Sequence, residues 1–152
     1  MKGDVVLFNE TMLEFGKGTL DLSSDTLKVG IVDDTITPAA DDATPTWGDY
    51  SANEVATTGN YTAGGETLTT VTWAMVSDLA TLGADDVVIA EDPSGFTDGY
   101  WGIIYDDTHG SDHALGFVQL HDGVNPESEQ AGDVSIEWTG GVVAEFPANV
   151  AA

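Results

Sequence analysis

One eight-residue segment, Asp106 to His113, holds the densest group of side chains that could do chemistry. His109 and His113 are four residues apart in it, and Asp106 and Asp112 add carboxylates. Imidazole and carboxylate groups are common ligands of divalent metals, and histidines at this spacing share one face of a helix. Gly110 and the apolar runs on both sides instead predict a hairpin loop, so a solvated turn is the favoured interpretation. We therefore expect no metal site, and these four residues are only weak candidates for one.

The other chemically suggestive segments lack a complete motif. Ser111 and His113 belong to the residue types of a hydrolase triad, but the sequence has no G-x-S-x-G elbow. The segment from Thr62 to Glu66 lacks the spaced glycines and the following lysine of a phosphate loop. Acidic pairs such as Asp33 and Asp34 are not spaced as in a calcium-binding loop. The sequence therefore predicts neither an enzyme nor a cofactor.

The charge of the chain restricts its partners. Its 152 residues include 27 acidic side chains and only 3 basic ones, all lysines (Lys2, Lys17 and Lys28), for a net charge of -24. Nucleic acids and anionic lipids are bound largely through basic groups, so both are excluded as partners. There is no cysteine, which excludes disulfides and thiol chemistry.

The same charge suggests a salt-rich environment. Self-repulsion destabilises a compact acidic protein at low ionic strength, and molar salt shortens the screening length to about 3 Å. The excess of acidic residues, the scarcity of lysine and the absence of arginine lead to the hypothesis of a halophilic host. An ordinary acidic protein is the alternative.

The apolar segments are short. None approaches the roughly 20 residues of a membrane-spanning helix. Asp4 and Glu10 interrupt the stretch that would form the apolar part of a signal peptide, so we expect neither membrane insertion nor classical secretion.

The spacing of apolar residues predicts one helix followed by strands. Val5, Phe8, Met12 and Phe15 recur at steps of three and four, which predicts an amphipathic helix that ends at the glycines around Lys17. Alternating or wholly apolar segments downstream predict strands at residues 26–32, 67–75, 86–90, 100–105, 115–121, 133–138 and 142–146.

These elements predict an all-β protein, an antiparallel β-sandwich of jelly-roll or immunoglobulin-like type with one short N-terminal helix. We expect a single domain over residues 1–152, with the helix in 1–18 and the sandwich in 26–146. A long loop at 33–58 and a tail at 147–152 complete it. Trp73, Trp101 and Trp138 fall in strands and are expected in the core, whereas Trp47 either pins the long loop or anchors an interface.

Segments along nearly the whole chain resemble a family of small structural proteins of tailed bacterial and archaeal viruses. The most specific are DLSSDTLKVGIV (Asp21 to Val32), NYTAGGETL (Asn60 to Leu68) and YWGIIYDDT (Tyr100 to Thr108). The resemblance implies a capsid decoration or cement protein, made in the host cytoplasm and bound as a homotrimer to the major capsid protein on the outer surface of the virion. It supplies no catalytic residues.

Such a role needs an apolar patch for the trimer mates. The candidates are in the predicted helix and the long loop: Phe8, Met12, Phe15, Trp47 and Tyr50. Core packing is the alternative for the helix residues.

Two other functions remain open at this point. One is a tail-, turret- or receptor-binding-associated virion protein that binds carbohydrate through aromatics such as Trp47, Tyr50 and Tyr61. The other is a metal-dependent hydrolase centred on His109 and His113.

Overall fold

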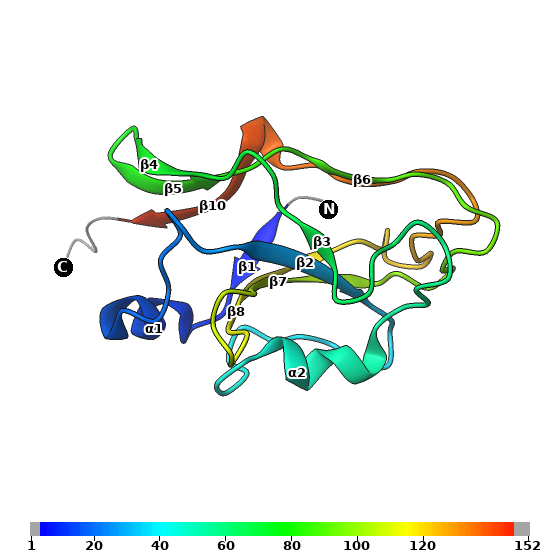
Figure 1. Ribbon diagram of the computed structural model, residues 1–152, viewed down its shortest axis with the longest axis horizontal. Helices are drawn as coiled ribbons and strands as arrows, with labels where there is room; N and C mark the ends of the chain where they lie inside the picture. Colours follow the sequence, from blue (N-terminus) through cyan, green and yellow to red (C-terminus); the bar gives the residue numbers. More distant parts are fainter. Residues whose placement is uncertain (1–3, 148–152) are drawn as a thin grey trace.

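The computed structural model describes residues 4–147, whose strands form three antiparallel sheets (Figure 1). The largest sheet has the order β1-β8-β7-β2-β3, the second has the order β10-β5-β4, and the third pairs β6 with β9. The elements are β1 (Val5–Leu7), α1 (Thr11–Lys17), β2 (Leu27–Val32), α2 (Trp47–Tyr50), the 3-10 helix η1 (Ser51–Asn53), β3 (Glu66–Thr67), β4 (Thr72–Val76), β5 (Leu79–Gly83), β6 (Val87–Ile89), β7 (Trp101–Asp106), β8 (Ala114–Gln119), β9 (Val134–Ile136), the 3-10 helix η2 (Thr139–Gly141) and β10 (Val142–Pro147).

Strand β7 lies in the middle of the five-stranded sheet, between β2 and β8. Its sequence is apolar at successive positions because both of its faces are covered. Ile104 belongs to the buried cluster on one face, and Ile103 and Tyr105 belong to the cluster on the other. A strand buried on both faces loses the alternation of a half-exposed one.

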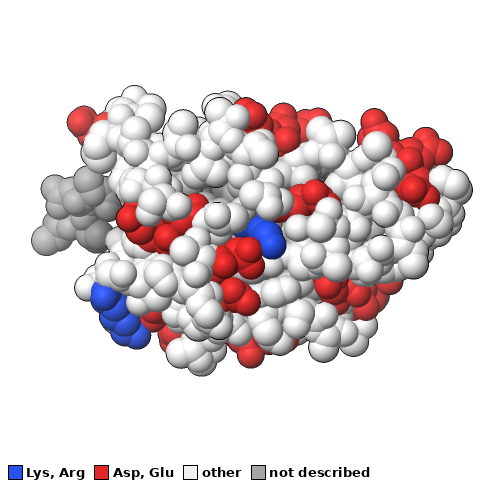
Figure 2. Space-filling model, viewed as in Figure 1, with Lys and Arg blue, Asp and Glu red and all other residues white. Residues whose placement is uncertain are grey.

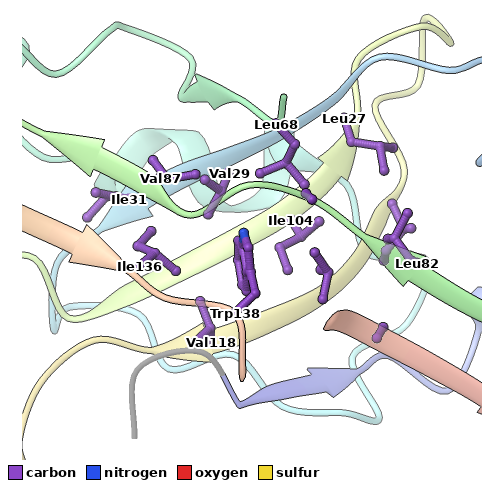
Figure 3. Close-up of a cluster of buried hydrophobic side chains, with 14 of the residues drawn as sticks. Leu27, Val29, Ile31, Leu68, Leu82, Val87, Ile104, Val118, Ile136 and Trp138 are labelled. Carbon is purple, nitrogen blue, oxygen red and sulfur yellow. The ribbon is translucent and has the colours of Figure 1, made fainter. Parts of the chain in front are cut away.

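The first cluster fills the space between the five-stranded sheet and the two smaller sheets (Figure 3). Val29 and Ile104 of the large sheet belong to this cluster together with Leu82 of β5 and Ile136 of β9, and Trp138 lies in its middle. Sheets facing each other across an apolar interior form a sandwich, so the all-β, antiparallel, sandwich-like fold is confirmed. Two of the three tryptophans expected in the core, Trp73 and Trp101, are only half-buried at its margin.

The second cluster lies on the opposite face of the five-stranded sheet, where α2 and its flanking loop cover it (Figure 1). Trp47 of α2 stacks on Tyr105 of β7, with ring centroids 5.1 Å apart and planes 4° apart. The indole also lies over Gly30 of β2, where an added Cβ would stand 2.3 Å from the ring. Glycine is needed at this position because the ring approaches the backbone so closely.

The N-terminal helix is shorter than its sequence pattern predicts. Residues Val5–Leu7 are an edge strand opposite Gly116 to Val118 of β8, and only Thr11–Lys17 is helical. The apolar positions at steps of three and four span both elements, so they do not define one helix face. Gly18 ends α1 in a left-handed conformation with φ 74°, as its position predicts.

Three strands were not predicted, β1, β3 and β5. Strand β5 forms a hairpin with β4 through Ser77 and Asp78, whose positive φ values of 50° and 67° suit a two-residue hairpin turn. Neither residue is the glycine that signals such a turn in a sequence. The predicted loop at 33–58 contains α2 and η1, and the predicted tail begins inside β10, which ends at Pro147. The rest of that tail, residues 148–152, lies outside the described residues.

Candidate functional site

Part of the polar segment at 106–113 gathers around an aspartate that is distant in sequence. His109 Nε2 lies 3.3 Å from Oδ2 of Asp25 and 3.8 Å from Oδ2 of Asp106. One ligand-type atom from each residue lies within 4.8 Å of the others. The Asp106 side chain is fully buried and that of Asp25 nearly so, whereas His109 is 39% exposed. We call this group the Asp25–Asp106–His109 cluster.

The pairing of β2 with β7 creates the cluster. Leu27, the first residue of β2, stands opposite Asp106, the last residue of β7. Beyond this pair, the Thr26 amide donates to Oγ1 of Thr108 at 2.7 Å, which keeps the preceding residue, Asp25, beside the end of β7. The sequence alone gave no sign of Asp25, because only the strand register brings it to the hairpin.

A turn orients the Asp25 carboxylate. The Asp25 amide donates to the Asp21 carbonyl at 2.8 Å, and the Asp21 amide donates back to Oδ2 of Asp25 at 2.8 Å. The hydroxyls of Ser23 and Ser24 donate to the Asp21 carboxylate. Reciprocal bonds of this kind hold a side chain in one orientation.

Asp106 has an unbalanced environment. Its Oδ1 accepts the Thr108 amide at 2.8 Å, but no hydrogen-bond donor among the described residues reaches its Oδ2. Burial, the largest cause, and the neighbouring Asp25 carboxyl together raise the pKa of Asp106 to about 6, although the Thr108 amide and His109 act in the opposite direction. Two ionised carboxylates only accept hydrogen bonds, so Asp25 and Asp106 can bond to each other only through a shared proton.

The other two metal candidates do not join this cluster. His113 points to α1, with Nε2 3.4 Å from Oε2 of Glu14, whose Oε1 accepts Lys17 Nζ at 2.8 Å. Asp112 has a positive φ of 49°, and its carbonyl accepts the Trp47 amide at 2.9 Å. His109 and His113 therefore contact different partners, Asp25 and Asp106 in one case and Glu14 in the other, and their spacing of four does not bring them to one ligand.

Most of the interface candidates are internal, which corrects the sequence prediction. Phe8, Trp47 and Tyr50 are buried in the second cluster, and Phe15 is half-buried against the first. Met12 alone of the five has more than half of its surface exposed. Trp47 therefore pins the long loop to the sheet and is not available to a partner in this conformation.

Burial also removes the aromatics proposed for carbohydrate binding. Trp47, Tyr50 and Tyr61 are all buried. The Tyr61 hydroxyl donates to Oε1 of Glu54 at 2.9 Å and accepts the Ile31 amide at 2.9 Å, so it ties a loop to β2. These three rings offer no surface on which a sugar could stack.

Four of the seven large exposed apolar side chains among the described residues belong to α1 and β4, and α1 and the β4–β5 hairpin lie at the same end of the molecule (Figure 1). Beneath them, Phe15 stacks on Trp73 at 5.9 Å, and both rings make edge contacts with Phe146 of β10. These three rings join the helix to the hairpin. We define the apolar end by its four large exposed side chains, Met12, Leu13, Met75 and Val76.

The charged side chains of the protein are almost all acidic. Figure 2 shows acidic side chains scattered over this face with little basic surface between them. Both lysines within residues 4–147 are engaged, Lys17 with Glu14 and Lys28 with Asp107 at 2.9 Å. Neither lysine is therefore available to pair with an acidic group of another molecule without giving up its present partner.

A buried carboxylate that sequence reasoning missed lies between two loops. Glu129 is fully buried, and its carboxylate accepts the amides of Asn60 and Phe96. An added Cβ at Gly59 or Gly95 would collide with it. Among 27 acidic residues, nothing in the local sequence of Glu129 distinguishes it.

No family model, curated protein or solved structure matches the chain. The likeness to small virion proteins therefore remains a prediction from sequence segments. Within residues 4–147, no helix has the length and apolar character needed to cross a membrane.

Proposed function

We propose that this chain is a noncatalytic structural protein of a tailed virus that decorates the head shell as a homotrimer bound to the major capsid protein. The segments quoted above, which resemble small virion proteins, support the role. The structural observation that carries the proposal is the group of exposed apolar side chains of the apolar end on a strongly acidic protein.

The apolar end suits contact between copies of this chain. Each copy carries a net charge of -24, so two copies repel each other over most of their surfaces. Repulsion is weakest where neutral side chains predominate, as on the exposed faces of α1 and β4. Removing Met12, Leu13, Met75 and Val76 from water also provides a favourable hydrophobic contribution.

A halophilic host completes the proposal. Molar salt screens the repulsion between exposed charges that are more than about 3 Å apart. Copies that repel each other in dilute buffer can then come into contact. The same condition favours hydrophobic association when the salt is excluded from protein surface.

Labelling of intact virus particles tests the position in the virion. An antibody fragment against the folded chain is applied to particles from the source of the sequence, with an unrelated fragment as control. We expect label over the head shell. Label confined to the tail or to turrets supports the alternative virion position, and recovery of the protein only from host cells, with unlabelled particles, contradicts the proposal.

A further inference from the structure

We propose that the Asp25–Asp106–His109 cluster binds one divalent first-row transition ion of the Zn²⁺ class. The ion would join the turn before β2 to the end of β7, two segments far apart in the chain. This site is independent of the proposed virion role.

One carboxylate oxygen of Asp106 is buried without a hydrogen-bond partner among the described residues. The side chain is fully buried, and Oδ2 has no hydrogen bond. This oxygen faces the cluster, because it lies 3.8 Å from Nε2 of His109. A buried carboxylate oxygen without a partner is costly, and a cation is the partner that satisfies it best. The described lysines pair with other acids, Glu14 and Asp107.

The distances within the cluster suit a tetrahedral ion. Two ligands about 2.1 Å from a tetrahedral zinc ion lie about 3.4 Å apart. The measured separations from His109 Nε2, 3.3 Å to Asp25 and 3.8 Å to Asp106, are close to that value. His109 can therefore share an ion with either carboxylate at nearly its present position, and all three ligand atoms lie within 4.8 Å of one another.

The cluster offers one imidazole nitrogen and two carboxylates as ligands. An imidazole nitrogen favours zinc and its neighbours over calcium or magnesium, which prefer all-oxygen sites. The amide of Asp21 already holds Oδ2 of Asp25, as an outer partner does for a metal ligand. His109 is partly exposed, so water has access to a remaining coordination position.

The test is equilibrium dialysis of untagged protein, first stripped with chelator, against Zn²⁺ in molar KCl with millimolar Mg²⁺. The salt and Mg²⁺ suppress loose binding to surface acids. We expect one Zn²⁺ per chain and a higher melting temperature in its presence, because an ion that binds only the folded state stabilises it. Co²⁺ in the same site should give the visible absorption of a coordinated ion.

Matched variants locate the ion. His109→Gln and Asp106→Asn should weaken binding more than about a hundredfold, beyond the ~10–100-fold loss expected for an outer partner. His113→Gln, four residues away and outside the cluster, should bind as the wild type does. If Asp106→Asn fails to fold, His109→Gln alone tests the site, because His109 is partly exposed and its replacement should leave the fold intact.

Two results overturn the proposal. One is the absence of stoichiometric Zn²⁺ binding by the wild type, in which case Asp25 and Asp106 share a proton instead. The other is binding that survives His109→Gln unchanged, which would place the ion on surface acids.

Discussion

At the residue scale, Trp47 connects the long 33–58 segment to the sheet. Its ring covers Gly30, stacks on Tyr105 and is buried. Replacing a buried tryptophan with alanine removes a large apolar surface and leaves a cavity. The substitution therefore lowers the stability of the single folded chain.

We predict that Trp47→Ala lowers the free energy of unfolding by about 3–5 kcal/mol. Urea denaturation of the single chain measures the change. Val124→Ala, at a highly exposed apolar residue, is the control and should stay within about 0.5 kcal/mol of wild type. A Trp47→Ala protein as stable as this control would show that the ring does not hold the loop.

Glu129 carries the second residue-scale prediction. Its carboxylate accepts backbone amides from Asn60 and Phe96 while fully buried. In Glu129→Gln, one acceptor becomes an NH₂ group that faces an amide, so we predict a loss of about 1.5–3 kcal/mol of stability. Thermal or urea unfolding measures this loss of stability. The control is Glu137→Gln, at an exposed glutamate directly after β9, which should hardly change the stability. Equal stabilities of the two variants would contradict this account of Glu129.

At the element scale, Glu14 attaches α1 to the β7–β8 hairpin. Its carboxylate contacts both Lys17 and His113. The hydrogen bond from Lys17 is the main cause that lowers the pKa of Glu14. A carboxyl with a lowered folded-state pKa stabilises the protein above its unfolded pKa, and this contribution is lost as the pH falls through the folded value.

We therefore predict that wild type is more stable than Glu14→Gln at pH 7 and that the difference narrows as the pH falls below about 4.3, the ordinary glutamate value. Urea unfolding of both proteins from pH 7 to pH 3 measures it. A difference that stays constant over this range would mean that the Glu14 charge does not contribute.

Some strands could be predicted from the sequence and others could not. Strands β2 and β7 were predicted nearly in full, because the alternation of apolar residues in β2 and the apolar run in β7 both reflect burial in the sheet. Strand β1 is three residues long and runs into α1, so its pattern merged with that of the helix. Strand β5 was missed because Ser77 and Asp78 make its turn without glycine.

The candidate site was harder to predict than the strands. His109 and Asp106 were named from local density, but Asp25 reaches them only through the register of β2 on β7. Burial of Trp47 and Tyr50 likewise depends on which sheet face the long loop covers. Neither the pairing of two strands nor the choice of a sheet face by a loop can be predicted from a local sequence pattern.

At the scale of the whole molecule, charge governs stability. The net charge is -24, and both described lysines are already paired with acids. Self-repulsion among the acids opposes folding, and salt screens it. We predict that the melting temperature rises as KCl increases from millimolar to molar. A scan of melting temperature at fixed pH measures this, and a flat or falling curve would contradict the halophilic interpretation.

The central claim is that copies of this chain assemble through the apolar end. The most direct measurement is the solution mass by light scattering in molar KCl, for wild type, Met75→Asp and the control Val124→Asp. The account predicts about 48 kDa, three chains of 15.9 kDa, for wild type and control, and a shift toward the single-chain mass for Met75→Asp. A wild-type mass of one chain in molar KCl, or a trimer that Met75→Asp leaves intact, would contradict it.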